Sequence, residues 1–212
     1  MNRLKSKLAN ALEYVHPKYF ASLARGDSSA QRKSVREKLR PQPASRAAKE
    51  HAVRSYAARG NCRIMVETGT FRGDLIFALL RDFDHLFSIE MQHELFLAAE
   101  LRFAAEKTVT IIEGDSAGAL PLILAKLHTP AVFWLDAHAS GDETARGAME
   151  TPIVSELSAI LNHSVKSHVI LIDDAREFGM GRHYPTLKRV QKMVAGTYKE
   201  FEVKDDIIRI TC

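Results

Sequence analysis

The sequence has few of the features that mark secreted, metal-chelating or membrane-spanning chains. Its 212 residues include only two cysteines, Cys62 and Cys212, and these show neither a disulfide framework nor a metal-binding spacing. No apolar run approaches the length of a transmembrane helix. The first twenty residues lack the apolar core and cleavage site of a secretory signal. We therefore expect a cytoplasmic protein whose thiols stay reduced.

Acidic residues are scarce in the first part of the chain. Residues 1–60 hold 14 Lys and Arg against 4 Asp and Glu, although the net charge of the whole chain is only +4. Helical patterns fill this segment, but aromatic residues are not interleaved with the basic ones as on nucleic-acid-binding surfaces. This favours a solvated helical face and argues against a nucleic-acid partner. We predict a basic helical extension over 1–60, which could cover a ligand pocket or mediate homodimerisation, and a separate domain over 61–212.

From residue 62 onward, short apolar segments alternate with helical patterns. Alternation of this kind predicts an α/β fold with a mostly parallel sheet and helices on both faces. A C-terminal hairpin over 198–212 is expected to add two antiparallel strands, which gives seven in all. The five preceding strands are expected at 62–68, 85–91, 109–115, 131–137 and 168–174.

Acidic residues stand where these expected strands end. Ligands of doubly wound sheets bind beyond the carboxyl ends of the strands, near the point where the strand order reverses. The sequence therefore predicts a binding site at that edge, although each acid taken alone could simply be solvated. The residues concerned are Glu67, Glu90, Asp115, Asp136, Asp173 and Asp174.

The segment VETGTFRGD predicts a glycine-rich turn between the first strand and a helix. Gly69 and Gly73 are separated by three residues, whereas a dinucleotide-binding turn would read G-x-G-x-x-G. A ligand without a pyrophosphate is therefore favoured, with tight helix packing as the alternative reading. Glu90 suits both hydroxyls of a ribose, and Asp115 with Ser116 suits an adenine. These positions together suit an adenosine that carries no phosphate.

Over residues 61–212 the chain resembles class I S-adenosylmethionine-dependent methyltransferases. Within that class it is similar to metal-dependent O-methyltransferases of the catechol, caffeoyl and macrocin type, which act on small molecules. The matching motifs are E-x-G-x-x-x-G at Glu67–Gly73, the acid Glu90, and GDSAGALPLI at 114–123. The resemblance implies a Rossmann-like fold and methylation of a hydroxyl on a sugar or natural product. It assigns S-adenosyl-L-methionine to Glu67, Thr68, Gly69, Thr70, Gly73, Glu90, Asp115, Ser116 and Asp136.

The same resemblance implies a divalent cation at Asp136, Asp173 and Asp174. Carboxylates that converge at neighbouring strand ends would repel one another unless a cation or protons neutralised them. Ligation by oxygen alone favours Mg²⁺. Alternatively, Asp173 and Asp174 only end a strand, and Asp136 only neighbours the cofactor.

The general base is the point at which the sequence departs from the catechol-type pattern. Those enzymes carry a lysine three residues after the acid of the fourth strand, and that position here is Ala139. His138 and His183 are the nearest substitutes, since a histidine has a suitable pKa for this work. We predict His138 and Asp136 as catalytic residues, with a metal-ligating or structural role for His138 left open.

Three other functions remain open at the level of sequence. A metal-independent methyltransferase could act on nitrogen, or on RNA through the basic extension. A cofactor-binding fold could also serve as a non-catalytic subunit. A nicotinamide dehydrogenase is least favoured, because its glycine pattern is missing.

Overall fold

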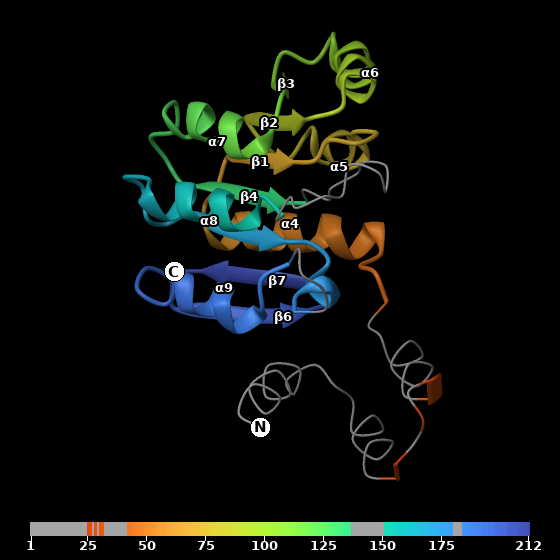
Figure 1. Cartoon of the computed structure of the whole chain (residues 1–212). Helices are drawn as coiled ribbons and strands as arrows, with labels where there is room; N and C mark the ends of the chain where they lie inside the picture. The colour runs from red at the N-terminus through yellow and green to blue at the C-terminus, as the bar shows by residue number, and fades with distance from the viewer. Residues whose placement is uncertain (1–24, 27, 29, 32–41, 137–150, 180–183) are drawn as a thin grey trace.

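A seven-stranded sheet forms the centre of the protein (Figure 1). The computed structural model describes residues 25–26, 28, 30–31, 42–136, 151–179 and 184–212. The strands follow the order β3-β2-β1-β4-β5-β7-β6, and only β7 runs against the others. The predicted mostly parallel sheet with a C-terminal antiparallel hairpin is thus confirmed. The strands are β1 Ile64–Thr68, β2 His85–Glu90, β3 Val109–Glu113, β4 Ala131–Leu135, β5 Val169–Ile172, β6 Glu200–Lys204 and β7 Ile207–Thr211.

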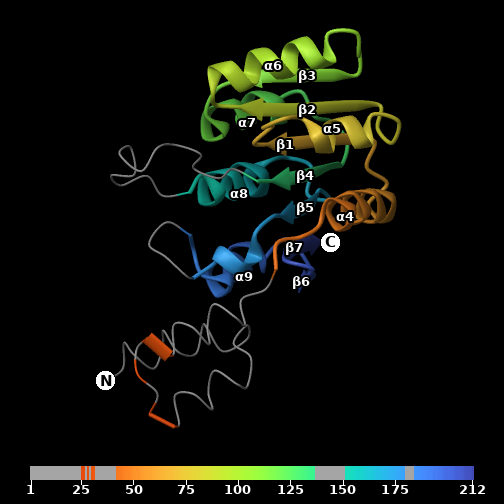
Figure 2. The same cartoon turned by 90° about the vertical axis from the view of Figure 1, so that its right-hand side faces the viewer.

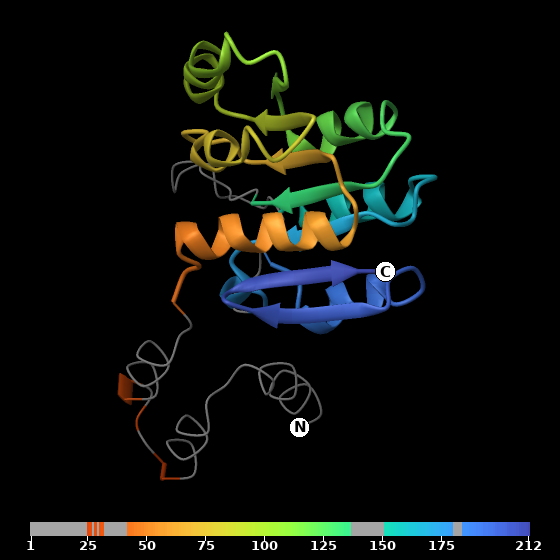
Figure 3. The same ribbon diagram turned by 180° about the vertical axis from the view of Figure 1, so that it is seen from behind.

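Helices cover both faces of this sheet, as predicted. Figure 1 shows α7, α8 and α9 in front of the sheet, and Figure 3 shows α4 on the opposite face. Figure 2 shows the strands in their order from β3 at one edge to β6 at the other. The helices are α4 Arg46–Arg59, α5 Asp74–Leu79, α6 His93–Phe103, α7 Ser116–Leu124, α8 Ile153–Asn162 and α9 Leu187–Val194, with a 3-10 turn η2 at Ala175–Glu177.

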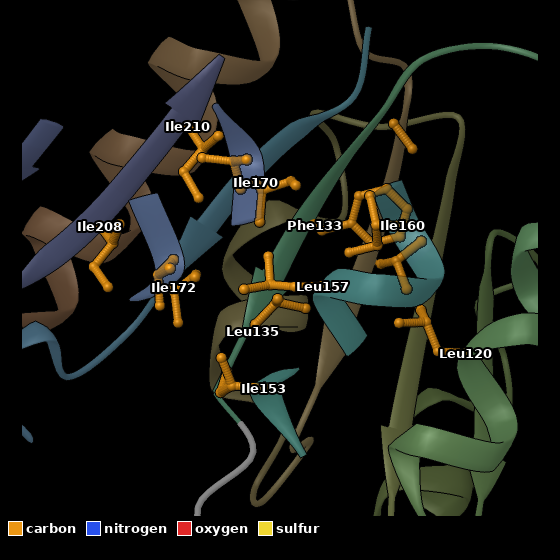
Figure 4. Packing of buried hydrophobic residues seen from close by; sticks show 14 of the residues in the cluster. Leu120, Phe133, Leu135, Ile153, Leu157, Ile160, Ile170, Ile172, Ile208 and Ile210 are labelled. Carbon is orange, nitrogen blue, oxygen red and sulfur yellow. The ribbon is translucent and has the colours of Figure 1, made fainter. Parts of the chain in front are cut away.

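Alternating side chains of the strands supply two separate hydrophobic cores. In β4, Phe133 and Leu135 join the core beneath α7, α8 and α9, part of which is drawn in Figure 4. Val132 and Trp134 point to the other face and join the core beneath α4, α5 and α6. Trp134 is fully buried there. Burial on both faces explains why these strands read as continuous apolar runs.

Helix α4 packs on the sheet although it lies within the predicted N-terminal extension. The Ser45 hydroxyl caps it by accepting a hydrogen bond from the Ala48 N–H at 3.2 Å. Ala52 and Val53 are buried against the sheet, where α4 contacts β4 and β5. Most of the chain before residue 42 lies outside the described residues, so the domain boundary at residue 60 and homodimerisation remain predictions. No helix of the described segments is long and apolar enough to cross a membrane.

The start of α8 differs slightly from the sequence-based expectation. The pattern predicts Thr151 as the cap, with Pro152 in the first turn. Instead, Pro152 is the N-cap residue and the helix begins at Ile153, whose N–H donates to the Thr151 hydroxyl at 3.5 Å. A proline has no N–H to lose, so it can precede the first turn without leaving a donor unpaired.

Candidate active site

The strand order reverses between β1 and β4, which are neighbours in the sheet. The chain runs outward from β1 to β2 and β3 on one side, and from β4 to β5 on the other. Glu67 and Thr68 end β1, and Asp136 directly follows β4. The Asp136 N–H donates to the Thr68 carbonyl at 3.1 Å. The predicted site residues of both strands therefore meet at the reversal point, where ligands of this fold class bind.

Glu67 is buried at the centre of this edge. Its Oε2 accepts a hydrogen bond from the Ser88 hydroxyl at 2.6 Å, and the Ser88 and Thr70 hydroxyls lie 2.7 Å apart. Burial raises the pKa of Glu67 to about 8, the Ser88 hydrogen bond opposes the rise, and the charges of Asp136 and Glu90 add to it. At neutral pH the carboxyl is therefore largely protonated, so it can donate a hydrogen bond as well as accept one.

The turn after β1 adopts a backbone shape that requires glycine. Gly69 and Gly73 have φ values of +87° and +69°. A Cβ on Gly73 would lie 2.6 Å from the Phe103 ring, so this glycine also permits close packing against α6. The packing alternative therefore accounts for Gly73. Gly69 remains the glycine for which a cofactor-binding role is the predicted explanation.

Glu90 joins the turns that follow β1 and β2. Its Oε2 accepts the Phe71 N–H at 2.8 Å, and its Oε1 accepts the Gln92 N–H at 2.9 Å. Each carboxylate oxygen has a second acceptor site. Both turns are thus fixed by one buried acid that retains the capacity to bind ribose hydroxyls.

Asp115 is the N-cap residue of α7 and Ser116 is its first residue, and their adenine-binding role remains a prediction. Asp115 is exposed and caps the helix through the Ala117 N–H at 3.4 Å, whereas Ser116 is buried. Close to Ser116 lies a buried acid of α8 that sequence analysis did not identify, Glu156. Burial raises the pKa of Glu156 to about 7.

The surroundings of Glu156 are short of hydrogen bonds. Within the described segments, the Thr68 hydroxyl and both Glu156 carboxyl oxygens are buried without a hydrogen bond of normal geometry, although Ser116 and Thr68 lie near the carboxyl. Buried polar groups of this kind are usually paired. The oxygens of Thr68 and Glu156 are compatible with a polar ligand bound at the end of β1. Glu156 could have been found from its spacing, because it lies three residues after Ile153 and four before Ile160, on the buried side of α8.

The acids at the ends of β4 and β5 are paired with a lysine from α4. Lys49 Nζ donates to Asp173 Oδ2 and lies 3.8 Å from Asp136 Oδ2. It also lies 5.8 Å from the centre of the Trp134 ring. Burial lowers the pKa of Lys49. The charges of Asp173 and, more weakly, of Asp136 and Asp174 raise this pKa and outweigh the effect of burial, so the net pKa shift is upward. Lys49 therefore carries its charge into this part of the site.

Asp173 and Asp174 are held by further protein donors. Asp173 Oδ1 accepts the Asp174 N–H at 2.9 Å. Burial and the charge of Asp136 raise the pKa of Asp173, and Lys49 opposes that rise. Arg176 Nη1 donates both to Asp174 and to the buried carboxylate of Asp206. Asp174 itself has a φ of +53°, a conformation that aspartate tolerates better than most residues.

The predicted magnesium ligands therefore do not form a cation site among the described residues. No group of three or more His, Cys, Asp or Glu side chains in these segments is arranged to hold a metal ion. Both oxygens of Asp173 accept hydrogen bonds from the protein, and Asp174 binds Arg176. The carboxylates were expected to be neutralised by a cation or by protons, and the chain supplies the positive charges of Lys49 and Arg176. The predicted base His138, its neighbour Ala139, and His183 lie outside the described residues.

Comparison with solved structures reveals the same fold in several methyltransferases. An O-methyltransferase from Bacillus cereus in complex with SAH has a TM-score of 0.57 at 14% identity, over 83% of this chain and 86% of that one. The O-methyltransferase TomG from Streptomyces achromogenes, involved in tomaymycin synthesis and solved with SAM, has a TM-score of 0.55 at 21% identity, over 91% and 94%. A Staphylococcus aureus protein assigned as a caffeoyl-CoA O-methyltransferase has a TM-score of 0.54 at 17% identity, over 92% and 98%.

Sequence comparison adds no family assignment. A scan against protein-family models found no match, and a search of curated proteins found none either. At the identities above, the structural likeness shows the fold. The chain thus has the Rossmann-like fold of class I methyltransferases and is similar to structures of O-methyltransferases.

Proposed function

We propose that this protein transfers the methyl group of S-adenosylmethionine to a hydroxyl of a small molecule such as a sugar or natural product. The observation that carries the proposal is the arrangement at the reversal point of a methyltransferase fold. There, buried Glu67 and Glu90 fix a turn with two left-handed glycines. S-adenosylmethionine supplies a methyl group activated by its positively charged sulfur.

The residues at the β1–β3 end suit the cofactor. Glu67, with Thr68, Gly69, Thr70 and Gly73, would surround its methionine end, where the Glu67 carboxyl can bind an amino or a carboxyl group. Glu90 would bind the ribose. The adenine would lie by Asp115 and Ser116, close to the unpaired buried oxygens of Glu156 and Thr68.

The hydroxyl acceptor rests on the structural neighbours, which are named O-methyltransferases. On the β4 side, Asp136 is 24% exposed, and its carboxylate can accept a hydrogen bond from an entering hydroxyl. This hydrogen bond would position the acceptor hydroxyl, and the Asp136 carboxylate would accept its proton. His138, the base candidate given by the sequence, lies outside the described residues and remains a prediction. No step of this proposal uses magnesium, because the described acids are paired with Lys49 and Arg176.

A methyl-transfer assay tests the proposal. Purified protein is incubated with S-adenosylmethionine carrying a tritiated methyl group and with a panel of sugars, phenols and natural-product alcohols, and the products are identified by mass spectrometry. We expect an O-methyl ether. We also expect Asp136→Asn to lower kcat more than it changes the affinity for S-adenosylhomocysteine. Labelled product found only on amines or on RNA would contradict the proposed acceptor.

A further inference from the structure

We propose that Lys49 takes the place of a divalent cation at the carboxylates of β4 and β5, which makes α4 part of the active site and the site independent of metal. The inference refines the proposed function, on which it rests for the identity of the active site. It is carried by the position of Lys49 between Asp136 and Asp173, an arrangement that the resemblance to metal-dependent enzymes does not predict.

Protein donors already occupy the carboxylates of Asp173 and Asp174. A divalent cation needs carboxylate oxygens that point toward a common centre. Asp173 Oδ2 instead accepts from Lys49, and Asp173 Oδ1 accepts from the Asp174 backbone. Asp174 in turn binds Arg176, whose guanidinium is shared with Asp206. A cation would have to break these contacts before it could bind Asp173 and Asp174 together.

Lys49 is held in place by α4, which packs on β4 and β5. Its helix is capped by Ser45 and anchored by buried residues, Val53 among them, so the lysine stem starts from a fixed backbone. The ammonium lies over the Trp134 ring at 5.8 Å, within the range of a cation–π contact. The charge is therefore supplied by a helix that packs on the sheet.

The charge of Lys49 also lowers the repulsion between the acids at this edge. Asp136 and Asp173 would repel each other at this edge without a positive charge between them. Lys49 provides that charge at a short distance from both acids, and a divalent cation in the same place would be repelled by the ammonium. An acceptor at this site then needs no pair of adjacent hydroxyls to chelate a metal.

Binding of Mn²⁺, followed by electron paramagnetic resonance of the free ion, tests the inference without an assay of activity. Mn²⁺ reports on the site because it shares the preference of Mg²⁺ for oxygen ligands. The proteins to compare are the wild type, Lys49→Met, the charge-conserving Lys49→Arg, Asp173→Asn, and the double variant Lys49→Met with Asp173→Asn. Thermal unfolding of each variant confirms that it is folded before the titration.

We expect the wild type and Lys49→Arg to bind Mn²⁺ no better than about 1 mM. Lys49→Met should gain at least about tenfold in Mn²⁺ affinity, because it exposes the carboxylates without their cation. The double variant should lose that gain. Wild-type binding well below about 1 mM that Asp173→Asn abolishes would overturn the inference, and this comparison does not require a folded Lys49→Met. A folded Lys49→Met that gains no affinity would overturn it as well.

The same protein preparations are titrated with S-adenosylhomocysteine. Tight Mn²⁺ binding by the wild type together with intact binding of S-adenosylhomocysteine would count against the role of Lys49 alone. Absence of S-adenosylhomocysteine binding in the wild type would count against the proposed function, whatever the result with Mn²⁺.

Discussion

The two sides of the strand-end site stabilise their buried acids by different means. On the β1–β2 side, Glu67 and Glu90 bind hydroxyls and backbone N–H groups, and burial raises the pKa of Glu67 to about 8. On the β4–β5 side, Asp173 and Asp174 are paired with Lys49 and Arg176. The first side therefore suits a ligand held by hydrogen bonds, and the second presents fixed charges to the reacting groups.

The pH dependence of stability provides the largest test of this contrast. Because the pKa of Glu67 is raised from 4.5 to about 8 by folding, its share of the stability is complete below pH 4.5 and is lost as the pH rises through about 8. That share amounts to up to about 5 kcal/mol. Glu67→Gln should remove it, whereas the exposed Glu113→Gln should not. Urea unfolding at several pH values measures the difference. If the free energy of unfolding changed with pH equally in the wild type and in Glu67→Gln, the raised pKa of Glu67 would be contradicted.

Loss of Arg176 should produce the next largest effect. Arg176→Met leaves the carboxylates of Asp174 and Asp206 without their shared partner, which we expect to lower the free energy of unfolding by about 3 kcal/mol. The control is Arg63→Met, which removes an exposed ion pair with Asp84 and should cost far less stability. Similar losses for both variants in urea unfolding would show that the Arg176 pairs add no special stability.

Gly73→Ala tests the backbone shape of the turn on the β1–β2 side. Its positive φ and the closeness of the Phe103 ring predict a loss of about 2 kcal/mol. Gly118→Ala is the matched control, since Gly118 lies in α7 with no atom within 4 Å of an added Cβ. That control should be neutral or stabilising. A harmless Gly73→Ala in thermal unfolding would remove the packing explanation for this glycine.

Glu90→Gln should produce the smallest of these effects, and we measure it on cofactor binding. The amide places a donor where two backbone N–H groups need acceptors, which disturbs the turn that would contact the cofactor. We expect the affinity for S-adenosylhomocysteine to fall about tenfold, equivalent to about 1.4 kcal/mol. Calorimetry measures it against Glu113→Gln, another acid at a strand end. An unchanged affinity in Glu90→Gln would exclude Glu90 from cofactor binding.

The sequence predicted the sheet because its central strands β1, β4 and β5 are apolar runs buried on both faces. It also predicted which acids end the strands, since the end of an apolar run marks the end of a strand. It did not predict Lys49, which lies 124 residues before Asp173 and looks like an ordinary surface lysine of a basic helix. Only the packing of α4 on β4 and β5 brings the two together. A local pattern cannot reveal a contact of this kind.

The central claim is that the reversal point between β1 and β4 binds S-adenosylmethionine. Calorimetric titration of the wild-type protein with the product S-adenosylhomocysteine, in buffer containing EDTA, tests it most directly. The account predicts one site with a dissociation constant well below about 1 mM, unchanged when Mg²⁺ replaces EDTA. No detectable binding at that concentration, or binding only with Mg²⁺, would contradict it.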